Sequence, residues 1–207
     1  MESVLDVYEK PYDPDYPVIC FDERPCQLIE DVLQPLPVEE GKVKREDYHY
    51  KRNGTAVVLT AIEPLAGKRI TEVREQRTKK DYSEFIFEVV KHYSKAKKII
   101  LIQDNLNTHN PSSFYENMPA DKAFMLSKKI EMVYTPKKAS WLNMAEIEFS
   151  ALSKQCLDRR IGDLKTLKKE VGAWVSSRNT KKVKIYWQFT KNKARDKFIR
   201  FYSEIVK

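Results

Sequence analysis

The sequence is poor in cysteine and glycine, and it has no long apolar run. Three cysteines, Cys20, Cys26 and Cys156, are too few for a disulfide framework, and no Cys-x-x-Cys pair suggests a zinc site. Five glycines and ten prolines among 207 residues exclude a collagen-like or low-complexity protein. No stretch of about 18 or more apolar residues is present, and the N-terminus has no basic segment followed by an apolar one. These absences exclude a membrane-spanning helix and predict a cytoplasmic protein.

Charge is distributed unevenly along the chain. The whole sequence has a formal net charge of +8, but residues 151–207 alone carry 16 basic and 5 acidic side chains, a net of +11. The first 150 residues hold 22 basic and 25 acidic side chains, a net of −3. Clustered lysines and arginines attract polyanions because phosphate binding releases condensed counterions. A nucleic-acid partner and an ordinary solvated helical surface both fit this charge pattern.

Hydrophobic periodicity predicts a mixed α/β fold. Strands are expected at residues 18–21, 54–65, 69–74, 99–102 and 130–134. Helices are expected at residues 81–93, 111–129 with a break near Pro119, 143–157 and 164–178. Residues 1–17 are interpreted as an extended N-terminal segment, and residues 34–53 as a polar loop. A hairpin followed by alternating helices and strands indicates a mixed sheet with helices on its faces.

Two aspartates follow aliphatic strands. Asp22 follows VICF, and Asp104 follows IILIQ. If the two strands are parallel neighbours, their carboxyl ends place both carboxylates at one edge of the sheet, where α/β proteins bind ligands. Paired carboxylates repel unless one takes up a proton or a cation lies between them. Oxygen ligands without thiolates suit Mg²⁺ or Mn²⁺, although a single aspartate at a strand end is also a common structural cap.

A third acid is expected at the helix start after the last strand. The segment SWLNMAEIEF offers Glu146 and Glu148, which lie about 200° apart around a helix and therefore cannot point the same way. Three carboxylates can hold two ions with a substrate phosphate between them. The apolar stripe lies between the two glutamates, so periodicity does not choose one of them.

Four sequence blocks resemble a known family. VICFDE (18–23), IQDNLNTH (102–109), YTPKKASWLNMAEIEFSAL (134–152) and WQFTKNKAR (187–195) are similar to the bacterial insertion-sequence transposases of the IS-six-thirty/mariner-like superfamily. The similarity covers nearly the whole chain, and the expected acids are spaced by 82 and 42 positions. It implies a ribonuclease-H-like α/β fold, with a mixed five-stranded sheet flanked by helices, and an Asp-Asp-Glu (DDE) active site. The implied parts are a catalytic domain at 18–180 and a basic, aromatic tail at 181–207.

The resemblance also implies roles for individual residues. The family's Leu-Asn-x-x-Glu motif matches residues 142–146 and selects Glu146, which leaves Glu148 as a helix-surface or supporting acid. The three acids would bind two Mg²⁺ or Mn²⁺ ions, with Asp22 shared between them, and would cut and rejoin DNA at transposon ends. Asn143 fits a helix N-cap as well as a DNA contact. Three residues would orient the carboxylates or touch the scissile phosphate: Asn105, His109 and Asn143.

Basic and aromatic residues near these motifs are expected to contact DNA. Trp141 fits packing beneath the helix start as well as stacking on a distorted base. The tail is expected to form a phosphate-binding arm, with Trp187 and Phe189 anchoring it to the domain. The expected DNA-binding residues are Lys137, Lys138, Trp141, Lys154, Arg159, Arg160, Lys191, Lys193 and Arg195.

The resemblance further implies transposon-end and target DNA as partners, a homodimer on that DNA and a location at the nucleoid. Full-length family members carry helix-turn-helix modules before the catalytic domain, whereas Met1 lies only some seventeen residues before the first expected strand. A separate helix-turn-helix subunit, a split gene or a truncated product would each account for this. Two alternatives stay open: a ribonuclease-H-like nuclease without strand transfer, and an inactive DNA-binding remnant.

Overall fold

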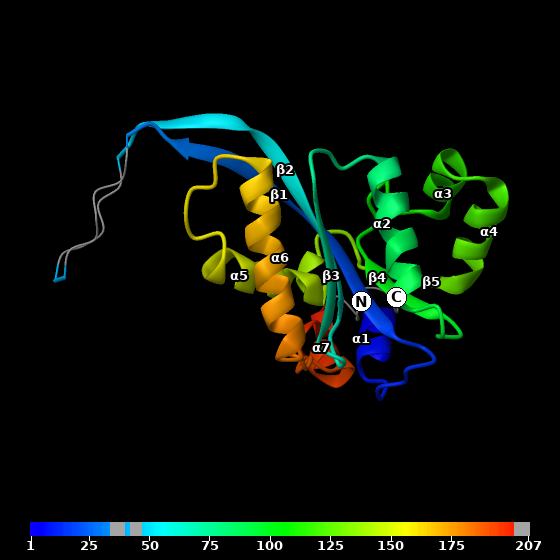
Figure 1. Ribbon diagram of the computed structural model, residues 1–207. Helices are drawn as coiled ribbons and strands as arrows, with labels where there is room; N and C mark the ends of the chain where they lie inside the picture. Colours follow the sequence, from blue (N-terminus) through cyan, green and yellow to red (C-terminus); the bar gives the residue numbers. More distant parts are fainter. Residues whose placement is uncertain (34–39, 42–46, 201–207) are drawn as a thin grey trace.

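A mixed five-stranded sheet forms the centre of the computed structural model, which describes residues 1–33, 40–41 and 47–200. β1, β2 and β3 pair antiparallel, whereas β4 pairs parallel with both β1 and β5. The expected mixed sheet is therefore confirmed. The strands, in the spatial order β3-β2-β1-β4-β5 (Figure 1), are β1 (Val18–Asp31), β2 (Tyr50–Glu63), β3 (Lys68–Arg74), β4 (Ile99–Gln103) and β5 (Ile130–Tyr134).

Helices cover both faces of the sheet. One face carries α2 (Lys79–His92), α3 (Pro111–Asn117) and α4 (Ala120–Lys129). The other face carries α1 (Glu2–Tyr8), α5 (Met144–Gln155), α6 (Leu164–Thr180) and α7 (Lys191–Lys197). Figure 1 shows the two groups on opposite sides of the strands. None of the helices in the described ranges has the length and apolar character needed to cross a bilayer.

Alternating side chains along the central strands supply both cores. On β2, Val57 and Leu59 pack with the aromatic side chains beneath α2, whereas Val58 and Ile62 pack on the opposite face. β4 is buried along its whole length, as expected for a parallel strand with helices on both sides. On β1, Phe21 faces α2 and Cys20 faces the α5 side, so alternation sends Asp22 toward α5.

The first residues do not form the extended N-terminal segment that was expected. Residues Glu2–Tyr8 form α1, in which Val4 and Leu5 are fully buried in a cluster with Cys20 on β1. The helix was not predicted because seven residues are too few to show a clear helical period. The prolines and tyrosines that follow, at residues 11–17, instead suggested an extended chain. Residues 1–10 are therefore part of the folded domain.

β1 is also longer than the expected strand at 18–21. It continues to Asp31 because it pairs antiparallel with β2 far beyond Asp22, from Cys20–Ile62 to Asp31–Tyr50. The two strands extend together as a long ribbon (Figure 1). Most of the loop expected at 34–53 lies outside the described residues, and its last four residues belong to β2. The other predicted helices and strands are confirmed, including the break between α3 and α4 at Pro119.

A buried ion-pair network fixes α5 against the rest of the domain. Glu148 on α5 accepts two hydrogen bonds from Arg69 on β3, at 2.5 and 3.1 Å, and two from Arg178 on α6, at 2.6 and 3.1 Å. Arg69 also donates to the backbone carbonyls of Gly67 and Val183. The expectation of a helix-surface acid at Glu148 is wrong, because its side chain is only 1% exposed.

Replacing Arg69 with methionine is expected to lower the free energy of unfolding by about 3 kcal/mol, because the buried Glu148 carboxylate loses one of its two arginine partners and two backbone carbonyls lose their donor. The matched control is Arg159→Met, which breaks the solvent-exposed pair with Glu170 and is expected to cost less than about 1 kcal/mol. Urea denaturation of the two variants measures the difference. Equal losses would contradict a structural role for the network.

Candidate active site

The parallel pairing of β1 and β4 brings two of the expected acids to one place. The register aligns Val18 with Ile100 and Cys20 with Ile102. Extending it by two residues puts Asp22 level with Asp104, where β4 has ended and the chain turns away. The expectation that the two strands are parallel neighbours is confirmed. Asp22 itself lies within the long β1, at the end of its parallel pairing, and not at a strand terminus.

Asp22 is a half-buried carboxylate surrounded by other acids. Burial raises its pKa, the backbone N–H of Glu23 donates to Oδ1 at 2.8 Å and lowers it, and the charges of Glu146 and Asp104 raise it again, to about 7. The side chain of Asn143 donates to Oδ2 at 3.2 Å. The negative charges of Glu146 and Asp104 therefore both act on Asp22, although the three residues are far apart in the sequence.

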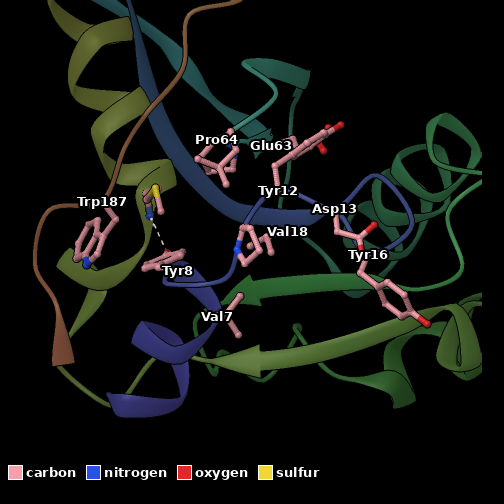
Figure 2. Close-up of a pocket in the computed structure, with 12 residues that line it drawn as sticks. Val7, Tyr8, Tyr12, Asp13, Tyr16, Val18, Glu63, Pro64 and Trp187 are labelled. Carbon is pink, nitrogen blue, oxygen red and sulfur yellow. Dashed lines mark hydrogen bonds between the residues drawn. The ribbon is translucent and has the colours of Figure 1, made fainter.

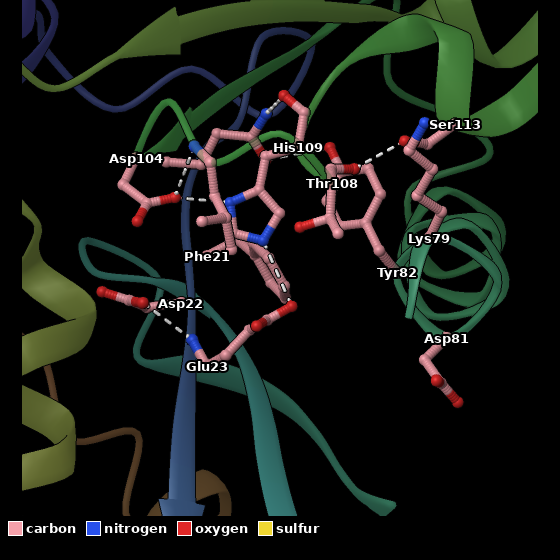
Figure 3. Close-up of polar contacts among 12 residues, drawn as sticks. Phe21, Asp22, Glu23, Lys79, Asp81, Tyr82, Asp104, Thr108, His109 and Ser113 are labelled. Atoms are coloured by element: carbon pink, nitrogen blue, oxygen red, sulfur yellow. Dashed lines mark hydrogen bonds and ion pairs between the residues drawn. The ribbon is translucent and has the colours of Figure 1, made fainter. Parts of the chain in front are cut away.

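His109 joins Asp104 to a second acid, Glu23 (Figure 3). Its Nδ1 lies 2.5 Å from Asp104 Oδ1, and its Nε2 lies 3.1 Å from Glu23 Oε1. The ring is held between Phe21 and Tyr82, at centroid distances of 5.2 and 4.9 Å. Both ring nitrogens thus face carboxylate oxygens inside an aromatic enclosure, which fixes the orientation of the imidazole and of the Asp104 carboxylate.

These contacts change the protonation of both partners. Burial lowers the pKa of His109, but its hydrogen bonds and charge interactions with Asp104 and Glu23 outweigh burial and raise it to about 9. The hydrogen bond from His109 holds the pKa of Asp104 below its usual value. His109 is therefore a cation at neutral pH, and it neutralises one of the surrounding acids.

Asn143 and Glu146 enter the site from the start of α5. Asn143 is the N-cap, with its side-chain oxygen accepting from the N–H of Ala145, while its amide donates to Phe21 O at 2.8 Å and to Asp22. Asn143 therefore combines the two expected roles of cap and carboxylate contact. Glu146 lies in the first turn and is exposed, whereas Glu148 points into the protein. Only Glu146 of the two can serve an open site beside Asp22.

The charge of this site is incompletely balanced. Across the described ranges, no lysine or arginine forms an ion pair with Asp22 or Glu146. Buried or crowded carboxylates without a counter-ion are unfavourable, and a hard divalent cation would relieve the repulsion. As the side chains stand, however, no three His, Cys, Asp or Glu residues in these ranges are arranged to hold a metal ion. The donors fit a metal by type and charge, and ligation requires their side chains to rotate toward one another.

Glu23 is the site residue that sequence reasoning missed. Its side chain is 4% exposed, it fixes His109, and its Oε2 is buried without a hydrogen-bond partner. The available signal was strand alternation: Glu23 follows Asp22 directly, so it must face the opposite side of β1, toward α2 and His109. Asn105 is exposed and makes no hydrogen bond to Asp22 or Asp104, so of its two expected roles only a contact with the scissile phosphate stays a prediction.

Three of the expected DNA-binding residues lie in the turn beside Glu146. Lys137 and Lys138 are exposed between β5 and α5, and Lys138 has a left-handed backbone, φ 60°. Trp141 is 45% exposed and stacks on Trp187 at 6.4 Å, with Phe189 meeting its edge. The expectation that Trp187 and Phe189 anchor the tail is confirmed, since both pack against the core cluster that contains α1.

The other expected DNA-binding residues are mostly engaged within the chain. Lys191 pairs with Asp6 and Glu9, and Arg195 pairs with Glu2 at 2.7 Å. Phosphate binding by these residues stays a prediction, and it would have to compete with these ion pairs. Arg159 pairs with Glu170, and Arg160 pairs with Asp31. Lys193 donates to the carbonyl of Gln188. Lys154 is exposed on α5.

A small cavity lies at the opposite end of the β1–β4 pairing from Asp22 (Figure 2). It has a volume of about 30 Å³ and is lined by Tyr8, Tyr12, Val18, Glu63 and Trp187, among others. Such a volume holds about one water molecule, so it is not a substrate pocket. At its edge Tyr8 donates to the carbonyl of Leu142 at 2.7 Å, which ties α1 to the turn that precedes α5.

Comparison with known proteins agrees with this geometry. A family model described as DDE superfamily endonuclease matches residues 17–168. The Mos1 transposase paired-end complex with left transposon end has a TM-score of 0.60 and 12% identity, covering 88% of this chain and 55% of that one. The catalytic domain of Mos1 mariner transposase has a TM-score of 0.58 and 12% identity, covering 88% of this chain and 87% of that one. The Mos1 mariner paired end complex with Mn has a TM-score of 0.58 and 14% identity, covering 88% of this chain and 55% of that one.

These findings define the class and then the family. The sheet order, the helices on both faces and the structural matches identify a ribonuclease-H-like domain. The chain belongs to the DDE superfamily endonucleases, which confirms the resemblance seen in the sequence. It spans about 55% of the length of the Mos1 chains in the paired-end complexes. A comparison with curated protein sequences returned no match.

The ion pairs of His109 make a pH-dependent contribution to stability. Its folded-state pKa of about 9 lies above the ordinary 6.5, so this contribution is complete below pH 6.5 and is lost as pH rises through about 9. Asp22, raised from 3.8 to about 7, also destabilises the fold as pH rises, but over an earlier window that is nearly complete at pH 7. We expect the unfolding midpoint in urea to fall between pH 6.5 and 9, and Glu23→Leu to flatten this dependence.

The control is Glu63→Leu, which removes an equally buried glutamate from β2 at the other end of the strand pairing. Its pH dependence above 6.5 is expected to match that of the unmodified protein. A Glu23→Leu variant that retains the full decline would contradict the assigned role of Glu23.

Proposed function

We propose that this chain is the catalytic domain of a DNA transposase, which uses divalent metal ions to cut DNA at transposon ends and to join the freed 3′ hydroxyl to target DNA. The observation that carries the proposal is the clustering of negative charge at one edge of the sheet. Asp22, Asp104 and Glu146 come from β1, from the end of β4 and from α5, and the pKa of Asp22 responds to both other acids. Membership of the DDE superfamily endonucleases supports the same reaction class.

The three carboxylates would divide the work of holding two ions. Asp22, on which both other acids act, would contribute to both positions, and Asp104 and Glu146 would each complete one. When bound, Mg²⁺ or Mn²⁺ would supply an activated water or hydroxyl nucleophile and charge stabilisation at the phosphate. The protein's own task is then to orient its carboxylates and to hold the phosphodiester in line with the attacking oxygen.

Surrounding residues would keep the carboxylates oriented. His109, fixed by Glu23, holds one oxygen of Asp104 and leaves the other for ligation. Asn143 donates to one oxygen of Asp22 and also caps α5, so it couples the orientation of Asp22 to the helix that carries Glu146. Partners of this kind typically change metal affinity or activity by about 10–100-fold when they are removed.

Lys137, Lys138 and Trp141 are proposed to contact DNA beside the acids. Both lysines are exposed, and no ion pair within the described residues engages them. The outer face of Trp141 is partly open, and its inner face is supported by Trp187, so the ring is pre-positioned for stacking on an unpaired base. These residues come from the turn between β5 and α5, next to Glu146.

The partners and location follow from the same proposal. DNA would be bound as transposon ends and as target, at the nucleoid, by a homodimer whose two active sites serve two ends. A helix-turn-helix module, on a separate subunit or on the same polypeptide, would supply recognition of the terminal repeats. Support comes from the Mos1 transposase, which has been solved in paired-end complexes and with Mn.

Cleavage is expected to depend on all three acids. Asp22→Asn, Asp104→Asn and Glu146→Gln should each lower nicking of supercoiled plasmid in Mn²⁺ by about 10³-fold or more, because residues that act as one unit are each indispensable. Glu63→Gln, a buried glutamate outside the site, should retain full activity. A duplex with a pre-cut 3′ hydroxyl end should join to plasmid. Cleavage without joining would indicate a nuclease that lacks strand transfer. If the unmodified chain binds DNA but never cuts it, and the three substitutions leave binding unchanged, the chain is an inactive DNA-binding remnant.

A further inference from the structure

The structure separates the basic residues of the C-terminal part into two groups. Several are paired with acids inside the chain, including Arg159, Arg160, Arg178, Lys191 and Arg195. A second group of six lysines, all exposed, lies on α6 and the four residues after it. No ion pair engages any of these six within the described ranges. They are Lys165, Lys168, Lys169, Lys181, Lys182 and Lys184.

The acids of this segment are already used. Between residues 165 and 184 the only acid is Glu170, which pairs with Arg159. Asp163, just before the helix, is the N-cap and accepts hydrogen bonds from the backbone and hydroxyl of Thr166. The lysines therefore leave a strip of net positive charge along the outer face of the helix.

The arrangement of the lysines works against helix stability. Lys165, Lys168 and Lys169 lie three and four residues apart in the first turns, so they repel one another. Lys165 also lies in the first turn of α6, where the helix dipole is positive and favours acids. A polyanion bound along this face would remove both penalties, whereas a helix surface that only needs solubility would mix both signs of charge.

The part of α6 between the two groups of lysines has small side chains that would let a DNA backbone come close to the helix. Between the two lysine groups, the outer face carries Gly172, Ala173, Ser176 and Thr180, all exposed, and space is open beside Gly172. Small side chains let a backbone approach the helix, and the hydroxyl of Ser176 can donate to a phosphate oxygen, whereas that of Thr180 donates to the carbonyl of Ser176. The opposite side of α6 is occupied, since Leu167 and Val171 pack in the core over β2 and β3. Seventeen helical residues extend for about 25 Å, the length of roughly seven base pairs.

We propose that the outer face of α6, from Lys165 to Lys184, binds the sugar-phosphate backbone of duplex DNA at a position separate from the catalytic acids. The choice of DNA as the polyanion rests on the proposed function. α6 packs on β3, at the edge of the sheet (Figure 1), whereas Asp22 belongs to the central strand β1 and Asp104 follows the neighbouring strand β4. The surface holds DNA without reading its sequence, because its donors are lysines and a serine hydroxyl that meet phosphates.

The test measures binding of the full chain to a fluorescein-labelled 30-base-pair duplex without transposon sequence, by anisotropy in EDTA over a range of NaCl concentrations. The variant with Lys165→Gln, Lys168→Gln and Lys169→Gln is expected to bind at least about tenfold more weakly near 0.1 M salt. The slope of log K against log salt should fall by about 2.7, since each phosphate contact contributes about 0.9. Its melting temperature should not fall, because repulsion is removed.

The control variant makes the same number of charge changes on the opposite face of the sheet, on α2 and α4, with Lys91→Gln, Lys122→Gln and Lys128→Gln, all exposed. It should change the slope by less than about 0.5. If the first α6 variant fails to fold, the double variant Lys181→Gln with Lys184→Gln replaces it in the test. Its slope of log K against log salt is expected to fall by about 1.8.

Equal effects of the α6 and control variants, or no binding of the duplex by the unmodified chain, would overturn the inference. Because EDTA removes metal, this result is independent of cleavage. Duplex binding that depends on α6, in a chain that never cuts DNA with Mn²⁺, would refute the proposed function and leave the α6 surface in place.

Discussion

The main constraint on this structure is that the fold brings three carboxylates to one edge of the sheet, where they repel one another. Parallel pairing of β1 and β4 sets Asp22 level with Asp104, and α5 brings Glu146 to the same edge. Burial and the two neighbouring charges raise the pKa of Asp22 to about 7, which means that the metal-free protein bears an electrostatic cost at this site. Strain of this kind is usually retained where function requires it. A bound divalent cation would turn the same geometry into an attractive interaction.

The rest of the domain holds these acids in position against their repulsion. His109, clamped by Glu23 and two aromatic rings, restrains Asp104 from the side of α2. On the other face, the ion pairs of Glu148 fix α5 to β3 and α6, and Tyr8 of α1 holds the turn before it. Two glutamates that differ by two positions on α5 thus have separate tasks: Glu148 anchors the helix, and Glu146 is presented at its surface.

Local patterns predicted much of the fold and part of the site. Short aliphatic runs followed by an aspartate identified β1, β4 and the two acids at the correct sheet edge. Periodicity could not choose between Glu146 and Glu148, because the choice depends on Arg69 and Arg178, which lie far away in sequence. The resemblance to a known family made that choice.

The tail shows the limit of reading charge from sequence. Its lysines and arginines form a basic run, but Lys191 and Arg195 meet acids of α1 that are more than 180 positions away. No local pattern reveals such partners, and the same holds for α1, whose burial depends on that docking. Glu23 was overlooked for a related reason, since its importance comes from His109, 86 positions further along.

The central claim is that Asp22, Asp104 and Glu146 form one metal site, and the most direct measurement is anomalous X-ray diffraction from crystals of the chain grown with Mn²⁺. Manganese peaks within coordination distance of all three carboxylates, with the side chain of Glu146 rotated toward Asp22, are the predicted result. Crystals saturated with Mn²⁺ that show no peak between these carboxylates, or peaks bound only elsewhere on the protein, would contradict it.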